Sequence, residues 1–173
     1  MPAEFTADAP CVARPSSREP MASATRRLLD RVPEADLGWR PHDKSMALGE
    51  LAGHIANIPW WCQIVLERPA FDVSPGGVDL RQKAPVSVAE LLSGFDAKVT
   101  AARTALAAAS DAEMQLPWTL KHADQEVFTM PRAAVLRSFV LNHLIHHRGQ
   151  LSVYLRLKNV AVPPIYGPTG DEA

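Results

Sequence analysis

The sequence predicts an all-α protein, a bundle of four helices with one long connection between two of them. Along four segments, apolar residues recur at intervals of three and four, which is the periodicity of a helix with one buried face. Prolines and glycines gather between these segments and separate them. The 173 residues suit a single domain with a core of its own.

Composition narrows the class of protein further. Eighteen basic and 19 acidic side chains give a net charge of −1, whereas proteins that follow nucleic-acid phosphates usually carry a basic excess. No apolar run approaches the roughly 20 residues that span a bilayer, and the N-terminus lacks the pattern of a signal peptide. The two cysteines, Cys11 and Cys62, do not make a disulfide framework. We therefore expect a cytoplasmic protein that binds neither nucleic acid nor a membrane.

The first elements follow from prolines and apolar spacing. Residues 1–20 contain four prolines among polar residues and predict an irregular N-terminal arm. The bundle itself is expected over residues 21–170. Its first helix is predicted for residues 21–32, because a helical stripe of apolar residues ends at Pro33.

The second helix is expected to begin at Ser45, a favourable N-cap, and to continue to Val65. Pro59 lies inside this segment, so we expect a kink or local break there. Residues 69–85 are rich in proline and glycine and predict a loop.

The rest of the chain predicts two more helices with a hairpin between them. The third helix is expected over residues 87–109. Residues 117–130 form two short extended pieces around a turn, which indicates a small β-hairpin. Pro131 suits the first turn of a last, long helix that keeps its apolar stripe to Leu155.

Histidines on two of these helices suggest a metal site. At 3.6 residues per turn, His143 and His147 lie one turn apart and about 40° apart around the last helix. Both fall on its apolar stripe, and His54 falls on that of the second helix. A buried polar group without a partner costs roughly 1–3 kcal/mol, and one divalent ion would satisfy all three imidazoles.

Two alternatives remain open on spacing alone. Each of these imidazoles could instead hydrogen-bond a separate partner in the core. His146 lies about 60° to the other side of His143, so it could replace His147 as the partner of His143.

Four stretches of the sequence form recognisable motifs, and together they resemble the DinB-like superfamily of bacterial metal-binding bundles. The resemblance covers roughly residues 21–170. The stretches are residues 39–46, 48–55, 142–150 and 162–168, which read WRPHDKSM, LGELAGHI, NHLIHHRGQ and VPPIYGP.

The resemblance implies a four-helix bundle of unusual connectivity, often a homodimer, with one metal-binding histidine on the second helix and two on the fourth. Carried over by motif, these ligands are His54, His143 and His147, and His146 becomes a neighbour. Three imidazoles suit zinc, nickel, copper or iron, and we expect zinc or nickel. Glu50 and Gln150 are candidates for orienting an imidazole, and Arg148 for holding an anionic group of a substrate.

The resemblance also implies a function. Characterised members include transferases and isomerases that use thiols such as mycothiol or bacillithiol, which a metal activates for attack on an electrophile. We therefore expect a metal-dependent S-transferase acting on a small-molecule substrate. The alternatives are a stress-linked bundle that binds a metal or ligand without catalysis, and a metal-dependent hydrolase with Glu50 as the candidate base.

Overall fold

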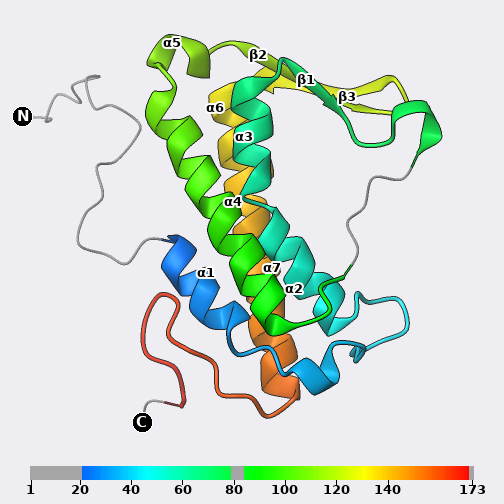
Figure 1. The fold of residues 1–173 in the computed structure, drawn as a ribbon, viewed down its shortest axis with the longest axis vertical. Helices are drawn as coiled ribbons and strands as arrows, with labels where there is room; N and C mark the ends of the chain where they lie inside the picture. Colours follow the sequence, from blue (N-terminus) through cyan, green and yellow to red (C-terminus); the bar gives the residue numbers. More distant parts are fainter. Residues whose placement is uncertain (1–20, 79–83, 172–173) are drawn as a thin grey trace, which may run out of the picture.

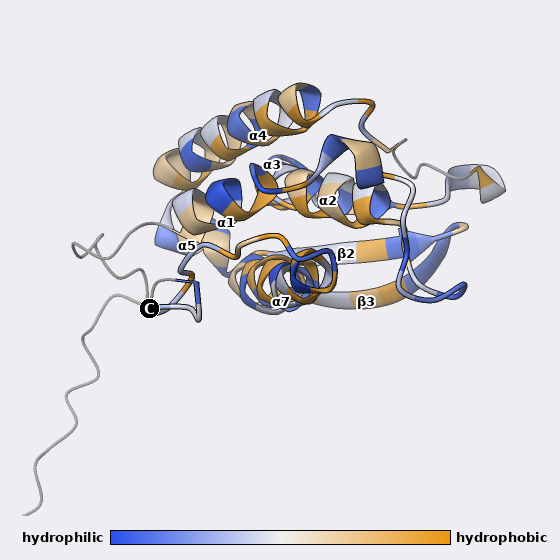
Figure 2. Ribbon diagram, turned by 90° about the horizontal axis from the view of Figure 1, so that it is seen from below, coloured by the Kyte–Doolittle hydropathy of each residue, from blue (hydrophilic) through white to orange (hydrophobic). Residues whose placement is uncertain are grey.

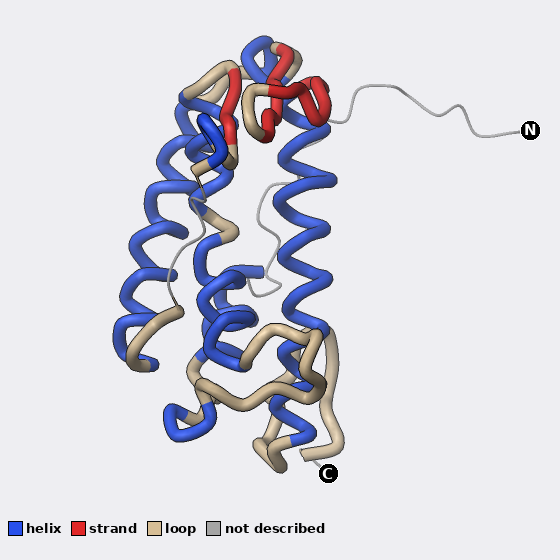
Figure 3. The backbone as a smooth tube through the Cα atoms, turned by 90° about the vertical axis from the view of Figure 1, so that its right-hand side faces the viewer, coloured by secondary structure: helices blue, strands red, loops and turns tan. Residues whose placement is uncertain are grey.

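A computed structural model of the protein describes residues 21–78 and 84–171. The arm expected over residues 1–20 lies outside the described residues. The described part of the chain is mostly helical, and a small three-stranded sheet lies at one end of the helices (Figure 1). The strands are at the opposite end from the C-terminal segment (Figure 3).

The elements follow one another in the order three helices, a strand, two helices, a hairpin and a last helical run made of α6 and α7. The helices are α1 (Met21–Leu29), α2 (Leu48–Asn57), α3 (Trp60–Glu67), α4 (Val88–Ala108), α5 (Asp111–Met114), α6 (Arg132–Val135) and α7 (Asn142–Leu157). The strands are β1 (Ala70–Asp72), β2 (Pro117–His122) and β3 (Gln125–Pro131). Short 3-10 turns occupy Glu34–Asp36 and Pro75–Gly77, and a π-helical turn, Leu136–Leu141, joins α6 to α7.

The four segments expected to be helical are helical, but a plain four-helix bundle does not describe the fold. The second helix is divided into α2 and α3 at Pro59. This break was expected, because proline has no backbone N–H group to donate within a helix. The start of α2 differs from the prediction. The N–H of Ser45 donates to the His42 carbonyl in a turn (2.9 Å), and the helix begins after Ala47, whose N–H donates to Glu50 Oε2 (2.6 Å).

The fold is mostly helical, but the sheet means that it is not the all-α fold that the sequence predicted. The expected hairpin is present as β2 and β3, which pair antiparallel around a turn in which Ala123 and Asp124 have positive φ. β1 lies within the segment expected to be a loop, and it pairs parallel with β2. Asp72 of β1 also links this strand to the hairpin turn, because its Oδ2 accepts a hydrogen bond from the Asp124 N–H (2.7 Å).

The core lies between the helices, with α4 on one side of α1–α3 and α7 on the other (Figure 2). α7 packs against α2 and α1, and α4 packs against α3, α2 and α1. Among the described residues, no helix combines the length and the hydropathy that crossing a bilayer requires. The largest fully buried side chains include residues of α1, α2, α4, α7 and β2: Leu28, Leu51, Ile55, Phe95, Trp118, Leu151 and Leu155.

Candidate metal centre

His54 of α2 and two histidines of α7, His143 and His147, lie together where the two helices pack. The Nε2 atoms of His54 and His143 are 3.0 Å apart. One ring nitrogen from each of the three residues lies within 4.8 Å of the corresponding nitrogens of the other two. The ring centroids are 4.5–4.8 Å apart in all three pairs. The structure therefore brings together the three histidines that the motifs indicated.

Helix geometry explains why these side chains meet. His143 and His147 are one turn apart on α7, so their side chains project from the same face. α2 packs against that face and places His54 opposite them. Gly53, next to His54, lets the segment before α4 come close, because a Cβ at Gly53 would lie 2.8 Å from Cδ of Pro85.

The three nitrogens fit a divalent metal ion. Bonds of about 2.0–2.1 Å in a tetrahedral site put two ligand nitrogens about 3.3 Å apart, close to the separation of the His54 and His143 Nε2 atoms. The nitrogens of all three residues lie within 4.8 Å of one another, so the rings must move closer together for all three to bind one ion. Within the described part of the chain, no carboxylate or thiol joins this group. Three protein ligands leave one tetrahedral position for water or another ligand.

The electrostatic environment keeps all three imidazoles neutral near pH 7. Desolvation is the first cause and lowers the pKa of His54 to about 4, with further contributions from His147 and His143. Desolvation also lowers the pKa of His143 and that of His147. Neutral imidazole is the form that binds a metal, so the site requires little proton release before an ion enters.

Of the three supporting residues proposed from sequence, Gln150 contacts the histidines. Its Oε1 lies 2.7 Å from Nδ1 of His147, which leaves Nε2 of that ring available to a metal. Glu50 is placed at the start of α2 instead. Its carboxylate accepts the Ala47 N–H and lies 3.9 Å from Nη2 of Arg40.

Arg148 points away from the histidines, towards α1 and the C-terminal segment. It is 2% exposed. Its guanidinium donates to the Tyr166 hydroxyl (2.7 Å) and lies over the Tyr166 ring, with longer contacts of 3.5 Å to Thr25 Oγ1 and the Met21 carbonyl. These contacts make Arg148 part of the packing between α7, α1 and the chain end.

The other histidines take different positions. His146 is exposed on α7, with its ring 4.8 Å from that of His147 and outside the group of three. Nδ1 of His42 accepts the Lys44 N–H in the loop before α2 (3.1 Å). The geometry therefore favours His147 over His146, as the motif did.

Aromatic side chains extend from the histidines towards the sheet, and sequence reasoning missed this continuity. The Phe139 ring lies 5.8 Å from that of His143, and Trp61 and Phe128 lie 5.3 and 5.8 Å from Phe139. All three of these aromatic residues are half-buried. The adjacent Trp60 and Trp61 are visible in the sequence, but their neighbours come from distant segments.

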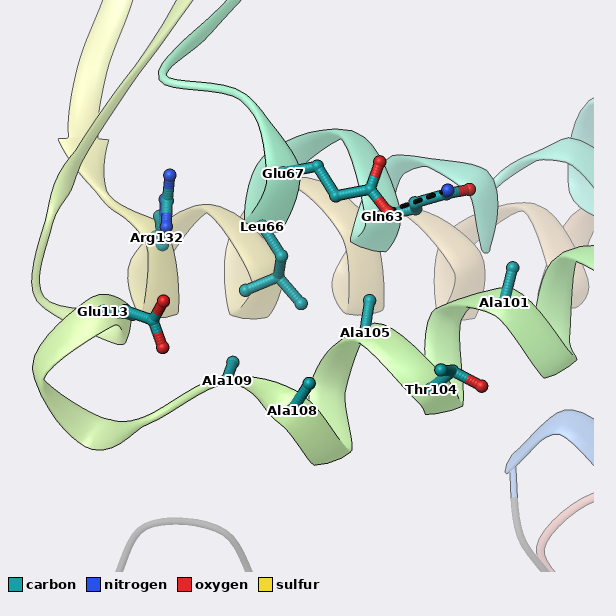
Figure 4. A pocket seen from close by; sticks show the side chains of 10 residues that line it. All are labelled: Gln63, Leu66, Glu67, Ala101, Thr104, Ala105, Ala108, Ala109, Glu113 and Arg132. Atoms are coloured by element: carbon teal, nitrogen blue, oxygen red, sulfur yellow. Dashed lines mark hydrogen bonds between the residues drawn. The ribbon is translucent and has the colours of Figure 1, made fainter.

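A hollow of about 450 Å³ lies elsewhere, between α3 and α4 (Figure 4). Alanines of α4 form one wall, and Leu66 and the hydrogen-bonded pair Gln63–Glu67 of α3 form the other. None of the three clustered histidines lines it. This hollow and the histidine cluster are therefore separate features of the molecule.

The fold and the histidine cluster together define a class. A family model described as DinB superfamily matches residues 19–151, and the chain belongs to this superfamily. The match includes α2 and the part of α7 that carries the two histidines.

Individual relatives agree with this assignment. The uncharacterized protein YrdA of Bacillus subtilis (strain 168) is 28% identical over 160 residues, which span 87% of this chain and 84% of YrdA. Two crystal structures share the fold. A DinB-like protein from Bacillus cereus ATCC 10987 has a TM-score of 0.62 at 22% identity and covers 84% of this chain and 91% of its own. The DinB-like protein YjoA from Bacillus subtilis has a TM-score of 0.64 at 17% identity, with 86% and 94% covered.

Proposed function

We propose that this protein is a metal-dependent transferase in which His54, His143 and His147 hold zinc or nickel and a low-molecular-weight thiol is the nucleophile. The observation that carries the proposal is the group of three neutral imidazoles with no fourth protein ligand among the described residues. A divalent ion with an open position would stabilise a thiolate at neutral pH. The thiol sulfur then bonds to an electrophilic carbon, the thiol proton passes to solvent, and the leaving group departs with its bonding electrons.

The side chains around the histidines support an organic electrophile as the second substrate. Phe139, Trp61 and Phe128 offer half-buried aromatic surface continuous with the His143 ring. Such surface binds an apolar or aromatic group through desolvation and ring stacking. Arg148 points to another part of the molecule, so it gives no support to an anionic substrate group at this centre.

The alternative functions receive less support. Hydrolysis needs a general base within reach of metal-bound water, and the one candidate, Glu50, binds the Ala47 N–H at the start of α2. A protein that binds a metal or ligand without catalysis could use the same three histidines. An assay of thiol conjugation distinguishes such a protein from a transferase. A homodimer, as the family motifs imply, remains a prediction.

A conjugation assay tests the proposal. Protein loaded with zinc or nickel is incubated with mycothiol, bacillithiol or glutathione and a chlorodinitrobenzene, and the thioether is followed by absorbance. The His54→Ala variant serves as the matched control. We expect conjugate at a rate well above that of His54→Ala with at least one thiol. Equal rates for the two proteins with every thiol would contradict transferase activity and favour a binding protein.

A further inference from the structure

The hollow between α3 and α4 exists because the face of α4 towards α3 carries small side chains (Figure 4). Four residues on this face follow the spacing of one side of a helix and are all alanines: Ala101, Ala105, Ala108 and Ala109. A larger apolar side chain at these positions would pack against α3, whereas alanine ends at Cβ. A volume of about 450 Å³ is left, which is within the range of pockets that hold small molecules.

Charged groups lie at the end of the hollow where α4 stops. Glu113 of α5 and Arg132 of α6 line this end, beyond Ala109 (Figure 4). From Ala101 to Ala109 the alanine wall extends about 12 Å along the helix axis, at 1.5 Å per residue. The hollow is therefore amphipathic, with methyl groups along its length and opposite charges at one end.

Arg132 has a hydrogen-bond donor without an acceptor. Its Nε is buried, and none of the described residues accepts a hydrogen bond from it. Its Nη2 makes one long contact, 3.4 Å, to the Arg68 carbonyl. Arg132 also takes part in none of the ion pairs found in the described part of the chain. A buried donor without an acceptor and a half-buried charge without a counter-ion are both unfavourable, so this guanidinium suits a ligand that supplies an anion.

The two carboxylates that line the hollow already have partners. Oε2 of Glu113 accepts hydrogen bonds from the N–H and the hydroxyl of Ser110, both at 2.8 Å, in the cap of α5. Oε1 of Glu67 accepts a hydrogen bond from Nε2 of Gln63 (2.9 Å). These contacts hold each carboxylate beside its own helix. A ligand that neutralises Arg132 must therefore bring a carboxylate of its own.

We propose that the hollow between α3 and α4 is a second ligand site, which binds a small amphipathic carboxylate with its apolar chain along the alanines of α4 and its carboxylate on Arg132. A carboxylate matches the planar guanidinium and accepts from Nε–H and an Nη–H together. Because the contact to Arg68 is long and weak, the guanidinium can turn towards the hollow. The apolar chain displaces water from the methyl groups and from Leu66.

The charges around the hollow make the proposal easy to contradict. Two carboxylates and one guanidinium line it, so the overall field favours a cation. Only direct contact with the guanidinium of Arg132 favours an anion. Octanoate and octylamine have the same apolar chain and opposite charges, and they therefore separate the two possibilities.

Isothermal titration calorimetry of the full-length protein near neutral pH tests the proposal with these two probes. We expect saturable binding of one octanoate per chain and binding of octylamine at least about 10-fold weaker. Octylamine that binds as tightly as octanoate would overturn the proposal, and so would the absence of saturable octanoate binding. The His54→Ala variant should bind octanoate as the wild type does, because the histidine cluster lies outside the hollow.

Two variants locate the bound octanoate. Arg132→Met keeps a long side chain without the charge and should lower the affinity by about 10-fold or more, as expected for lost hydrogen bonds to a charged group. Ala105→Leu should abolish binding, because the larger side chain occupies the hollow. Arg103→Ala is the matched control. Arg103 is an exposed cation of α4 outside the hollow, so its loss should change the affinity by no more than about two-fold.

The outcomes are independent of the metal centre. Octanoate binding that is unchanged in Arg132→Met would overturn the proposal even if Ala105→Leu did not fold. Circular dichroism and zinc affinity equal to those of the wild type show that Arg132→Met is folded. A wild-type protein that binds no zinc or nickel contradicts the proposed function, whereas octanoate binding still tests the second site.

Discussion

The Nε2 atoms of His54 and His143 lie 3.0 Å apart although the two residues are 89 positions apart in the sequence. Such a contact between two neutral imidazoles holds one proton, which a metal ion would replace. The packing of α2 on α7 sets this distance, so the centre depends on the tertiary fold and cannot be supplied by the His143–His147 pair alone.

We first predict that His54→Ala, His143→Ala and His147→Ala each lose most of the bound metal. Removing a ligand should reduce affinity by more than the roughly 10–100-fold expected for a partner that only orients one. Elemental analysis of protein purified without added metal measures the effect. His146→Ala is the control and should keep its metal, because His146 is exposed and outside the group. Unchanged metal in the three variants would rule out this centre.

A second prediction concerns the contact between Gln150 and His147. Because Gln150 Oε1 lies 2.7 Å from His147 Nδ1, Gln150→Ala should weaken zinc binding by roughly 10-fold or more, and Gln150→Glu should restore part of it through its carboxylate oxygen. Competition with a chromogenic chelator measures the affinity. Glu50→Ala is the comparison: it should lower stability by about 1 kcal/mol through the lost contact with the Ala47 N–H and leave zinc affinity unchanged. The reverse pattern would show that Glu50 orients the centre.

Much of the helical architecture could be predicted because the long helices carry apolar residues at helical spacing and prolines such as Pro33, Pro59 and Pro69 mark several helix ends. The sheet could be predicted only in part. The hairpin is local, so its turn and alternation are visible in the sequence, whereas β1 has three residues and pairs with Thr119, Leu120 and Lys121 across a long connection. The start of α2 was misplaced because Glu50 reaches back to the Ala47 N–H, and Ser45 belongs to the preceding turn.

The three histidines that lie together could be named from sequence, but most of the side chains around them could not. The π-helical turn before α7 does leave a signal in the sequence. Val135, Phe139, His143, His147 and Leu151 are each four residues apart, and in an unbroken α-helix such a series drifts by about 160°. Val135 and Leu151 are both fully buried, and the π-helical turn between them reduces this drift by about 100°, the angle of one residue. The direction of Arg148 had no such signal, because it depends on where α1 and Tyr166 lie.

The turn of the hairpin gives a third prediction, on stability. Ala123 has φ of 49°, which is unfavourable for a residue with a Cβ and suits glycine. Ala123→Gly should therefore raise the free energy of unfolding by about 1 kcal/mol. Ala107→Gly, on the exposed side of α4, is the opposite control and should lower it by about 0.5–1 kcal/mol. Urea denaturation compares the two, and equal destabilisation would contradict the turn geometry.

A fourth prediction is that metal-free protein loses stability as the pH falls through the range from 6.5 to about 4. Burial lowers the pKa of His54 from 6.5 to about 4, and the pKa values of His143 and His147 are lowered too. In this range the unfolded chain binds protons that the folded chain does not, so acid favours unfolding. Thermal unfolding at several pH values measures the decline. His54→Gln should make the decline shallower, and stability that rises on acidification would contradict the environment described for these residues.

The last prediction separates the two roles considered for Arg148. The residue is 2% exposed and joins α7 to Tyr166 and Thr25, so Arg148→Ala should lower the free energy of unfolding by about 2–5 kcal/mol, as truncation of a long buried side chain does. Arg103→Ala, on an exposed position of α4, should change it by no more than about 0.5 kcal/mol. The folded fraction of Arg148→Ala should bind zinc as tightly as the wild type and show the same KM for its substrates in the conjugation assay. A variant of normal stability with a raised KM would instead place Arg148 in substrate binding, and would require the segment around Tyr166 to move so that the guanidinium could reach the metal centre.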